Sequence, residues 1–349
     1  MRALVYDAVG TAPRVTALPD PVAPPGGAVV RVAAAGLCRS DWHAWAGHDA
    51  DVATFPHVPG HEFAGVVESV GEGVDPSWVD RPVTAPFVHA CGRCPTCAAG
   101  DGQVCPHQRQ PGFTDPGAFA ERVVVLAADT NLVALPGEVD PATAAGLGCR
   151  VATAHRAVTA RARVVPGQRV VVLGCGGVGL AAVQLAVARG AEVCAVDVDA
   201  GSRERASAVG ADLTLDGAAG DDVVVDAVRD WSDGGAHVAI EAVGSPDACR
   251  VGVLALRRRG RHVQVGLLPP AAGAVAVPMD RVVAWELDVL GSHGMAAADY
   301  PAMLDLVARG RLRPDRLVRR TVGLAEAADL VASFDRATAA GITLVDPAQ

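Results

Sequence analysis

A glycine-rich turn in the middle of the chain places the strongest constraint on its fold. The apolar run 169–173 has the composition of a buried strand, and Gly174-Cys-Gly-Gly-Val-Gly179 follows it directly, before a helical stretch at 178–189. Glycines at this spacing allow a tight turn and a close approach of backbone N–H groups to a phosphate at the start of a helix. We therefore predict a nucleotide site at Gly174, Gly176, Gly177, Val178 and Gly179.

Further apolar runs repeat the pattern of a strand followed by a helix. They lie at 192–196, near Leu213, and at 238–240, 262–265 and 288–290. Short apolar runs that alternate with helical segments are typical of strands buried on both faces. The pattern predicts an α/β domain with a six-stranded, doubly wound parallel sheet.

An acidic residue follows the second strand of this predicted sheet. Asp197 lies 23 residues beyond Gly174. A carboxylate at this place accepts hydrogen bonds from the adenosine-ribose hydroxyls and repels a 2′-phosphate, so the sequence favours NAD over NADP. A glycine-rich turn that binds some other nucleotide is the alternative. Arg203 either covers the adenine or faces solvent.

The two ends of the chain have a different composition. Residues 1 to about 150 are rich in Val, Gly and Pro, with alternating runs at 27–33 and 63–70 that are typical of strands. Beyond about 292, amphipathic segments at 297–309 and 324–336 precede a strand-like run at 342–345. This material exceeds the six-strand core, so we expect it to return to the first domain, with the nucleotide domain as an insertion.

Four cysteines lie within a short loop, with the spacing C-x2-C-x2-C-x7-C. Four thiolates at such spacing can hold one tetrahedral Zn²⁺ with no open position, which describes a structural site. An iron–sulfur cluster or a pair of disulfides are the alternatives. The predicted ligands are Cys91, Cys94, Cys97 and Cys105.

The overall composition excludes several classes of partner. A net charge of -9 and the absence of a basic stripe argue against nucleic acid and anionic membranes as partners. No secretory signal or membrane-spanning run is visible, and nine cysteines in a large chain point to metal or redox roles, so we expect a cytoplasmic protein. The chain contains no Lys, which excludes Schiff-base chemistry.

Three further potential ligands, Cys38, His61 and Cys149, are far apart in the sequence, and spacing alone does not connect them. A resemblance does. The segments Cys38-Arg-Ser-Asp-Trp-His, Gly60-His-Glu, the four-cysteine loop, the isolated Cys149 and the glycine-rich turn occur in the order seen in the zinc-containing medium-chain dehydrogenase/reductase family, alcohol dehydrogenase branch. The chain resembles this family over nearly its whole length.

This resemblance implies a fold and an activity. A Rossmann domain at 153–288 would be inserted into a β-rich, GroES-like catalytic domain at 1–152 and 289–349, with a structural-zinc lobe at 89–108. Two zinc ions are implied, one structural and one catalytic, the latter held by Cys38, His61 and Cys149 with a fourth position open. The implied reaction is hydride transfer between a primary or secondary alcohol and NAD, with zinc as Lewis acid. A polyol or amino-alcohol dehydrogenase, or a non-catalytic NAD-binding relative, are the alternatives.

The resemblance also implies roles for residues around this zinc. Asp41 would orient the His61 imidazole. Glu62 would lie behind the zinc or replace its water at rest, the alternative being a salt-bridged carboxylate near the cleft. Ser40, the nicotinamide-ribose hydroxyl and His43 would carry the proton to solvent, a step that suits the pKa of histidine; an exposed surface imidazole is the alternative for His43.

Several other positions match cofactor contacts of the family. Thr153 would contact nicotinamide, the backbone of Val265, Gly291 and Ser292 would hold its carboxamide, and Arg39 would meet the pyrophosphate. Ile342 stands where many members carry an Arg, which weakens the expected cofactor affinity. Small-molecule alcohols, aldehydes or ketones are the implied partners, and a homo-oligomer, a tetramer or a dimer, is implied. The candidate walls of a substrate pocket, which are equally suited to a core or a subunit contact, are Trp42, Trp45, Phe55, His57 and Trp285.

Overall fold

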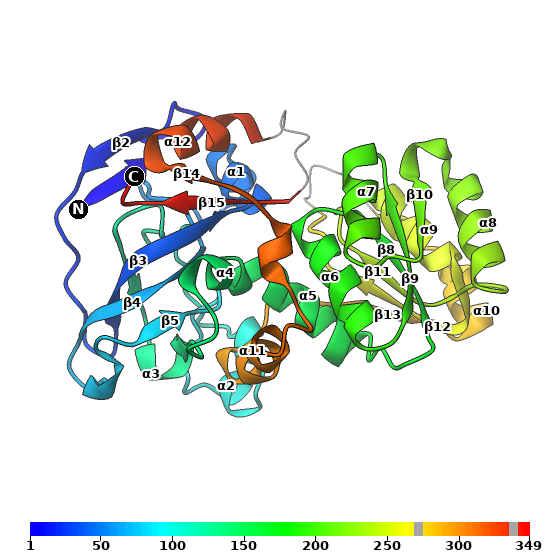
Figure 1. Cartoon of the computed structure of the whole chain (residues 1–349), viewed down its shortest axis with the longest axis horizontal. Coiled ribbons are helices and arrows are strands. Elements are labelled where there is room, and N and C mark those ends of the chain that lie inside the picture. The colour runs from blue at the N-terminus through cyan, green and yellow to red at the C-terminus, as the bar shows by residue number, and fades with distance from the viewer. Residues whose placement is uncertain (269–274, 335–340) are drawn as a thin grey trace. The chain divides into compact units, whose positions relative to one another are not determined.

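The computed structural model describes residues 1–268, 275–334 and 341–349 of the chain. These residues form two compact units. Unit 1 contains residues 1–152, 294–334 and 342–349. Unit 2 contains residues 153–268 and 275–293, together with Gly341. Figure 1 shows both units, with most of their helices and strands labelled.

Unit 1 is built on a mainly antiparallel sheet with the strand order β14-β15-β3-β4-β5-β7, in which β6 also pairs with β3. Strands β1 and β2 form a separate antiparallel pair. The strands of unit 1 are β1 (Arg2–Val5), β2 (Arg14–Ala17), β3 (Ala28–Leu37), β4 (Glu62–Val70), β5 (Pro82–Thr84), β6 (Arg122–Val125), β7 (Val133–Ala134), β14 (Val318–Gly323) and β15 (Ile342–Asp346).

Short helices accompany this sheet. Their bounds are α1 (Arg39–Trp45), α2 (Pro95–Ala98), α3 (Ala128–Asn131), α4 (Pro141–Ala145), α11 (Tyr300–Ala308) and α12 (Leu324–Ser333). Alternating buried positions of β3, β4 and β6 pack with Leu324, Ala327 and Val331 of α12 into one core. Strand β15 pairs with β3, so the end of the chain completes the sheet that its beginning starts.

Unit 2 is built on a six-stranded parallel sheet with the order β10-β9-β8-β11-β12-β13. This order, in which the chain moves outward from β8 and then returns to its other side, is that of a Rossmann sheet. The strands are β8 (Arg169–Leu173), β9 (Glu192–Asp197), β10 (Leu213–Asp216), β11 (Ala236–Glu241), β12 (Leu256–Gln264) and β13 (Asp288–Gly291).

The helices that connect these strands bury aliphatic side chains against the sheet. Their bounds are α6 (Gly177–Ala188), α7 (Ala200–Ala208), α8 (Asp221–Trp231), α9 (Pro246–Leu254) and α10 (Met279–Trp285), whereas α5 (Ala152–Arg156) precedes β8 and begins at the last residue of this part of unit 1. Valines of α8 and α9 form a core with Val171 and Ala239 of the central strands. Strands β8 and β11 lie at the centre of the sheet, and all their residues except Arg169 and His237 are buried, as is typical of parallel strands whose two faces are covered by helices.

The predicted fold class is confirmed: a Rossmann-type parallel sheet is inserted into a β-rich unit. The positions of the domain boundaries stay a prediction, although β13 pairs with β12 as far as Gly291, beyond the boundary expected at 288. The predicted helix at 324–336 is observed over Leu324–Ser333, and residues 335 and 336 lie outside the described residues. Among the described residues, no helix has both the length and the apolar character needed to cross a membrane.

Candidate active site

The register of two neighbouring strands brings Cys38 and His61 together. Strands β3 and β4 run antiparallel, and Gly36 near the end of β3 pairs with Glu62 at the start of β4. Cys38 follows β3 as the N-cap of α1, and His61 immediately precedes β4. Cys38 and His61, which are 23 positions apart in the sequence, therefore lie at the same end of this antiparallel strand pair.

Cys149 reaches the same place from a different part of unit 1. It lies in a turn of π-helix, Leu147–Val151, and such turns are frequent at functional sites. The Gly148 carbonyl accepts hydrogen bonds from the backbone N–H of Phe87 at 3.1 Å and from the Tyr300 hydroxyl at 3.2 Å. One ligand atom from each of Cys38, His61 and Cys149 lies within 4.8 Å of the others.

The imidazole of His61 is oriented by Asp41 in α1. The Asp41 carboxylate is 2.9 Å from His61 Nδ1 and accepts hydrogen bonds from the backbone N–H of Cys38 at 2.8 Å and of Gly60 at 3.2 Å. With Nδ1 engaged by a carboxylate, Nε2 is left to face the two sulfurs, and this buried atom has no hydrogen-bond partner among the described residues.

The electrostatics of this cluster suit a cation. The neighbouring Cys149 thiol and His61 imidazole, together with the charge of Arg150, hold the pKa of Cys38 well below its usual value, despite burial. Burial lowers the pKa of His61, but Asp41 and Cys38 outweigh it and hold that pKa well above its usual value. Two sulfurs and an imidazole nitrogen are a donor set that Zn²⁺ prefers, so these residues fit a catalytic zinc.

Glu62 has a basic partner that the sequence analysis did not identify. Its carboxylate is completely buried and is paired with Arg150, whose side chain is also buried. The structure therefore favours the salt-bridged alternative for Glu62. An Arg directly after one predicted ligand and a Glu directly after another were the available signals, but nothing in the sequence showed that the two would meet.

Ser40 and His43 lie on α1, close to the ligands. The Ser40 hydroxyl oxygen is 3.9 Å from Cys38 Sγ. His43 is half-buried, and its Nδ1 lies 3.0 Å from Nδ1 of the exposed His48, a neighbour that the sequence analysis did not select. Burial lowers the pKa of His43, and the charges of Arg39 and His48 lower it further. His43 is therefore neutral near pH 7 and able to accept a proton.

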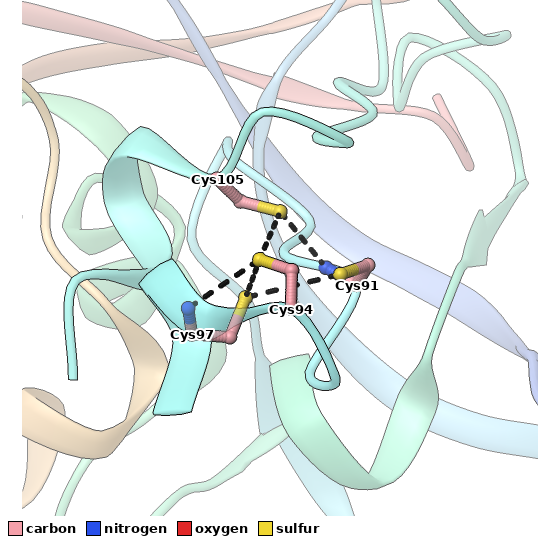
Figure 2. Close-up of side chains that lie close together, drawn as sticks. All are labelled: Cys91, Cys94, Cys97 and Cys105. Carbon is pink, nitrogen blue, oxygen red and sulfur yellow. Dashed lines mark hydrogen bonds between the residues drawn. The ribbon is translucent and has the colours of Figure 1, made fainter. Parts of the chain in front are cut away.

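The four-cysteine loop folds into a second sulfur cluster in unit 1. Cys94 caps the short helix α2, which carries Cys97, and Figure 2 shows the four side chains converging. Sulfur–sulfur distances are 3.4 Å for Cys94 and Cys97, 3.8 Å for Cys94 and Cys105, and 3.9 Å for Cys91 and Cys97. A tetrahedron with Zn–S bonds of about 2.3 Å has edges of roughly 3.8 Å. All four cysteines are free, so the cluster fits a metal and not a pair of disulfides.

The glycine-rich turn of unit 2 has the geometry expected of a phosphate-binding loop. Gly174 follows β8 with a φ of +89°, which favours glycine, and Gly176 is the N-cap of α6, ahead of Gly177, Val178 and Gly179. A Cβ on Gly179 would overlap the Gly174 carbonyl, whereas a Cβ on Gly176 would meet no protein atom within 4 Å. The turn is closed on its inner side and open where a pyrophosphate would approach.

Asp197 ends β9 beside this turn. Its carboxylate accepts hydrogen bonds from the backbone N–H of Cys175 at 2.6 Å and of Asp199 at 2.9 Å. Arg203 donates to the carbonyl oxygens of Asp197 at 2.8 Å and Val198 at 3.0 Å, and pairs with Asp216 at 3.3 Å. Hydrogen bonds thus fix the Asp197 carboxylate at the end of β9, and Arg203 binds the backbone carbonyl groups of the two residues at that strand end.

The other predicted cofactor contacts are divided between the units. Thr153 is buried at the start of unit 2. Val265 and Ser292 follow neighbouring strands. Their backbone N–H groups donate hydrogen bonds to the backbone carbonyl oxygens of Glu241 and Gln264, respectively. The backbone carbonyl oxygen of Gly291 accepts a hydrogen bond from the Arg161 side chain. Arg39 is exposed on α1 in unit 1.

Several of the candidate pocket aromatics have structural partners. Trp45 packs against the cores of unit 1 and donates from Nε1 to the Thr11 carbonyl at 2.7 Å. His57 contacts the Gly112 carbonyl, and Phe55 lies against Tyr6. Trp285 packs against the core of unit 2, and Trp42 lies against His43 and His48.

Comparison with known proteins identifies relatives over at least nine-tenths of the chain. Residues 24–137 match the alcohol dehydrogenase GroES-like domain, and residues 177–309 match the zinc-binding dehydrogenase domain. An alcohol dehydrogenase of Geobacillus stearothermophilus is 33% identical over 90% of both chains. A sorbitol dehydrogenase of Halalkalibacterium halodurans is 32% identical over 93% of this chain and 94% of its own.

Solved structures agree with these relatives. The alcohol dehydrogenase TADH from Thermus sp. ATN1 is 32% identical and superposes with a TM-score of 0.90 over 99% of both chains. Identity above 30% over nine-tenths of the chain, together with both matched domains, shows common descent. The chain therefore belongs to the zinc-containing medium-chain alcohol dehydrogenase family.

Proposed function

We propose that this enzyme catalyses the reversible, NAD-linked oxidation of a primary or secondary alcohol to an aldehyde or ketone, with a zinc ion held by Cys38, His61 and Cys149. The observation that carries the proposal is the convergence of these three ligand atoms within 4.8 Å around a buried imidazole nitrogen that has no partner among the described residues. When bound there, zinc supplies a Lewis acid that lowers the pKa of the reacting hydroxyl group.

The protein residues orient the site and move the proton. Asp41 holds His61 in the tautomer that directs the Nε2 lone pair toward the sulfurs. Ser40, beside Cys38, takes part in removing the alcohol proton, and the neutral His43 receives it on the way to solvent. These roles rest on the positions of both residues on α1 and on the lowered pKa of His43.

The cofactor site is assigned to unit 2. The backbone at the start of α6 would receive the pyrophosphate, since the turn is open at Gly176. The carboxylate of Asp197 would accept hydrogen bonds from the adenosine-ribose hydroxyls and disfavour a 2′-phosphate, which supports NAD over NADP. A second zinc would be held by the four sulfurs of Cys91, Cys94, Cys97 and Cys105. This zinc would be structural, because four protein ligands leave no coordination position for a substrate.

A substrate screen tests this proposal. The zinc-loaded protein is incubated with NAD⁺ or NADP⁺ and with primary alcohols, secondary alcohols and polyols, while the absorbance of the reduced nicotinamide is followed. We expect turnover with NAD⁺ and at least one alcohol, and none in a Cys149→Ser variant. Zinc-loaded protein that reduces neither cofactor with any alcohol, and oxidises neither reduced cofactor with any carbonyl, would disprove the proposal.

The polyol arm of the screen addresses the second candidate. The similarity to a sorbitol dehydrogenase favours it, and a preference for sorbitol over simple alcohols would establish it.

We also propose a homo-oligomeric, cytoplasmic enzyme. The cytoplasmic location is supported by the nine cysteines, which are all free of disulfides, as expected in a reducing compartment. Light scattering of the purified protein would give the oligomeric state.

A further inference from the structure

One buried arginine directly follows one proposed zinc ligand and contacts the neighbours of the other two. Arg150 follows Cys149 and is 5% exposed. Its Nη1 donates a hydrogen bond to the carbonyl oxygen of Leu37, the residue before Cys38, at 2.9 Å. Its Nε donates to Oε2 of Glu62, the residue after His61, at 2.9 Å. The guanidinium group therefore joins the three segments that carry the ligands.

The Glu62 carboxylate is fully engaged by this arginine. The backbone N–H of Arg150 donates to Oε1 at 2.7 Å, Nε lies 3.1 Å from the same oxygen, and Nη2 pairs with Oε2. Carboxylate oxygens are themselves zinc ligands, and this one belongs to the residue next to His61. A rigid, forked pairing of this kind fixes the direction of the carboxylate as well as its charge.

The strand beside the pair leaves room for it. Gly36 pairs with Glu62 across β3 and β4, and a Cβ on Gly36 would overlap both Glu62 Oε2 and Arg150 Nη2. Gly36 does not adopt a positive φ, so the absence of a side chain is required by space and not by the backbone conformation. The ion pair thus depends on the residue types at three positions on three segments, which are Gly36, Glu62 and Arg150.

We propose that Arg150 is a positioning residue for the catalytic metal. It holds the segments of Cys38, His61 and Cys149 in register and keeps the Glu62 carboxylate away from the metal, so that the fourth position remains available to the substrate. This inference rests on the proposed function, because it assumes a metal at these three ligands.

Cobalt substitution tests the inference with a readout that does not depend on turnover. Co²⁺ is loaded into the protein, and the absorption bands of the catalytic site are assigned by their loss in Cys149→Ser. In Arg150→Met we expect altered bands, because the released Glu62 carboxylate competes for the metal. Adding Glu62→Gln to Arg150→Met should return the bands toward those of the wild type, whereas a merely structural defect would not respond to the second change.

Metal retention gives a second measurement. A chelator should remove the catalytic metal from Arg150→Met about 10- to 100-fold faster than from the wild type, the usual cost of losing a residue that orients metal ligands. Arg122→Met is the matched control. Arg122 forms a similar forked pair with Glu68 on the same strand β4, but this pair is at the surface and away from the ligands. Its metal release should equal that of the wild type.

The outcomes separate the inference from the proposed function. Wild-type bands and wild-type metal release in Arg150→Met would overturn the inference while leaving the proposed function intact. A wild-type protein that binds no metal at Cys38, His61 and Cys149 would instead overturn the proposed function. If Arg150→Met does not fold, Arg150→Lys and Gly36→Ala, which disturb the fork without removing its charge, take its place, and unchanged spectra and release rates in both would again overturn the inference.

Discussion

Asp41 illustrates how one buried side chain determines two features of the site. Its carboxylate caps the start of α1 through the backbone N–H of Cys38 and also contacts the ring of His61. A hydroxyl or amide could cap the helix, but the carboxylate also stabilises a ring that faces a cation. At the residue scale, the site thus depends on groups that satisfy local backbone demands and orient ligands at once.

The role proposed for His43 predicts a change in the pH profile of activity. Because the pKa of His43 is lowered mainly by burial, the residue is neutral at pH 7 and alcohol oxidation should decline only below the usual titration range of histidine. His43→Gln should lower kcat near pH 7 by roughly 10²-fold, and imidazole buffer should partly restore it. A variant with the wild-type kcat and pH profile would remove His43 from the proton path.

Asp197 predicts the cofactor preference. Loss of a charge-assisted hydrogen bond of about 1.5–3 kcal/mol should raise KM for NAD⁺ by roughly 10- to 100-fold in Asp197→Ala and weaken the discrimination against NADP⁺. The ratio of kcat/KM for the two cofactors measures this. Asp197→Asn is the control, since one amide oxygen can still accept from the Cys175 backbone. A ratio that stays the same in both variants would refute the role.

His155 predicts how stability depends on pH. Burial, with the charge of Arg189 adding to it, lowers the pKa of His155 to about 4. Between about pH 6.5 and 4 the unfolded chain therefore binds a proton that the folded chain does not, so this residue makes stability fall as the pH falls. Wild type should lose about 2 kcal/mol more than His155→Leu between pH 7.5 and pH 5. Urea unfolding at both pH values provides the comparison, and equal losses would contradict it.

At the element scale, turns and caps position the chemistry more than long helices do. Cys38 and Cys94 are each the N-cap of a helix, Cys149 lies in a π-helical turn, and the glycine-rich turn supplies the N-cap of α6. Helix starts expose backbone N–H groups that hydrogen-bond to thiolates and anions. The elements around the sites therefore supply donors as well as geometry.

The four-cysteine lobe makes a prediction of its own. Cys97→Ser removes one of four sulfurs from a cluster that contains no other ligand group, so the lobe should release its metal and unfold locally. Zinc analysis should fall by one ion per chain, and limited proteolysis should cut within 89–108. Cys175→Ser is the matched control, since Cys175 is buried in unit 2 and belongs to neither metal cluster of the described residues. A Cys97→Ser protein with an unchanged zinc content would exclude this assignment.

At the scale of the whole molecule, the two kinds of site belong to different units. The proposed catalytic ligands and the four-cysteine cluster lie in unit 1, whereas the glycine-rich turn and Asp197 lie in unit 2. Each unit has its own sheet and its own core. This division would separate the proposed metal chemistry from the proposed nucleotide binding.

Metal removal tests this separation. Protein treated with a chelator should lose alcohol oxidation completely, but should still bind NADH within about tenfold of the metal-loaded affinity, because the proposed nucleotide contacts of unit 2 contain no metal ligand. Quenching of tryptophan fluorescence by NADH measures binding before and after treatment, and added Zn²⁺ should restore turnover. Complete loss of NADH binding without metal would show that the two functions are not separable.

Local motifs were predictable from the order of residues. The turn at Gly174–Gly179 and the loop from Cys91 to Cys105 depend on groups a few positions apart, so spacing already determines which atoms can meet. The alternation of apolar runs with helical segments predicted the parallel sheet for the same reason, since each connection is short and obeys a fixed handedness.

Contacts between distant segments were decided only in the folded molecule. Cys38, His61 and Cys149 meet because Gly36 pairs with Glu62 across β3 and β4 and because a π-helical turn approaches that edge. The ion pair of Glu62 with Arg150 has the same origin. Strand register and side-chain packing depend on the whole core, because a shift of one residue would turn every side chain of a strand to the opposite face.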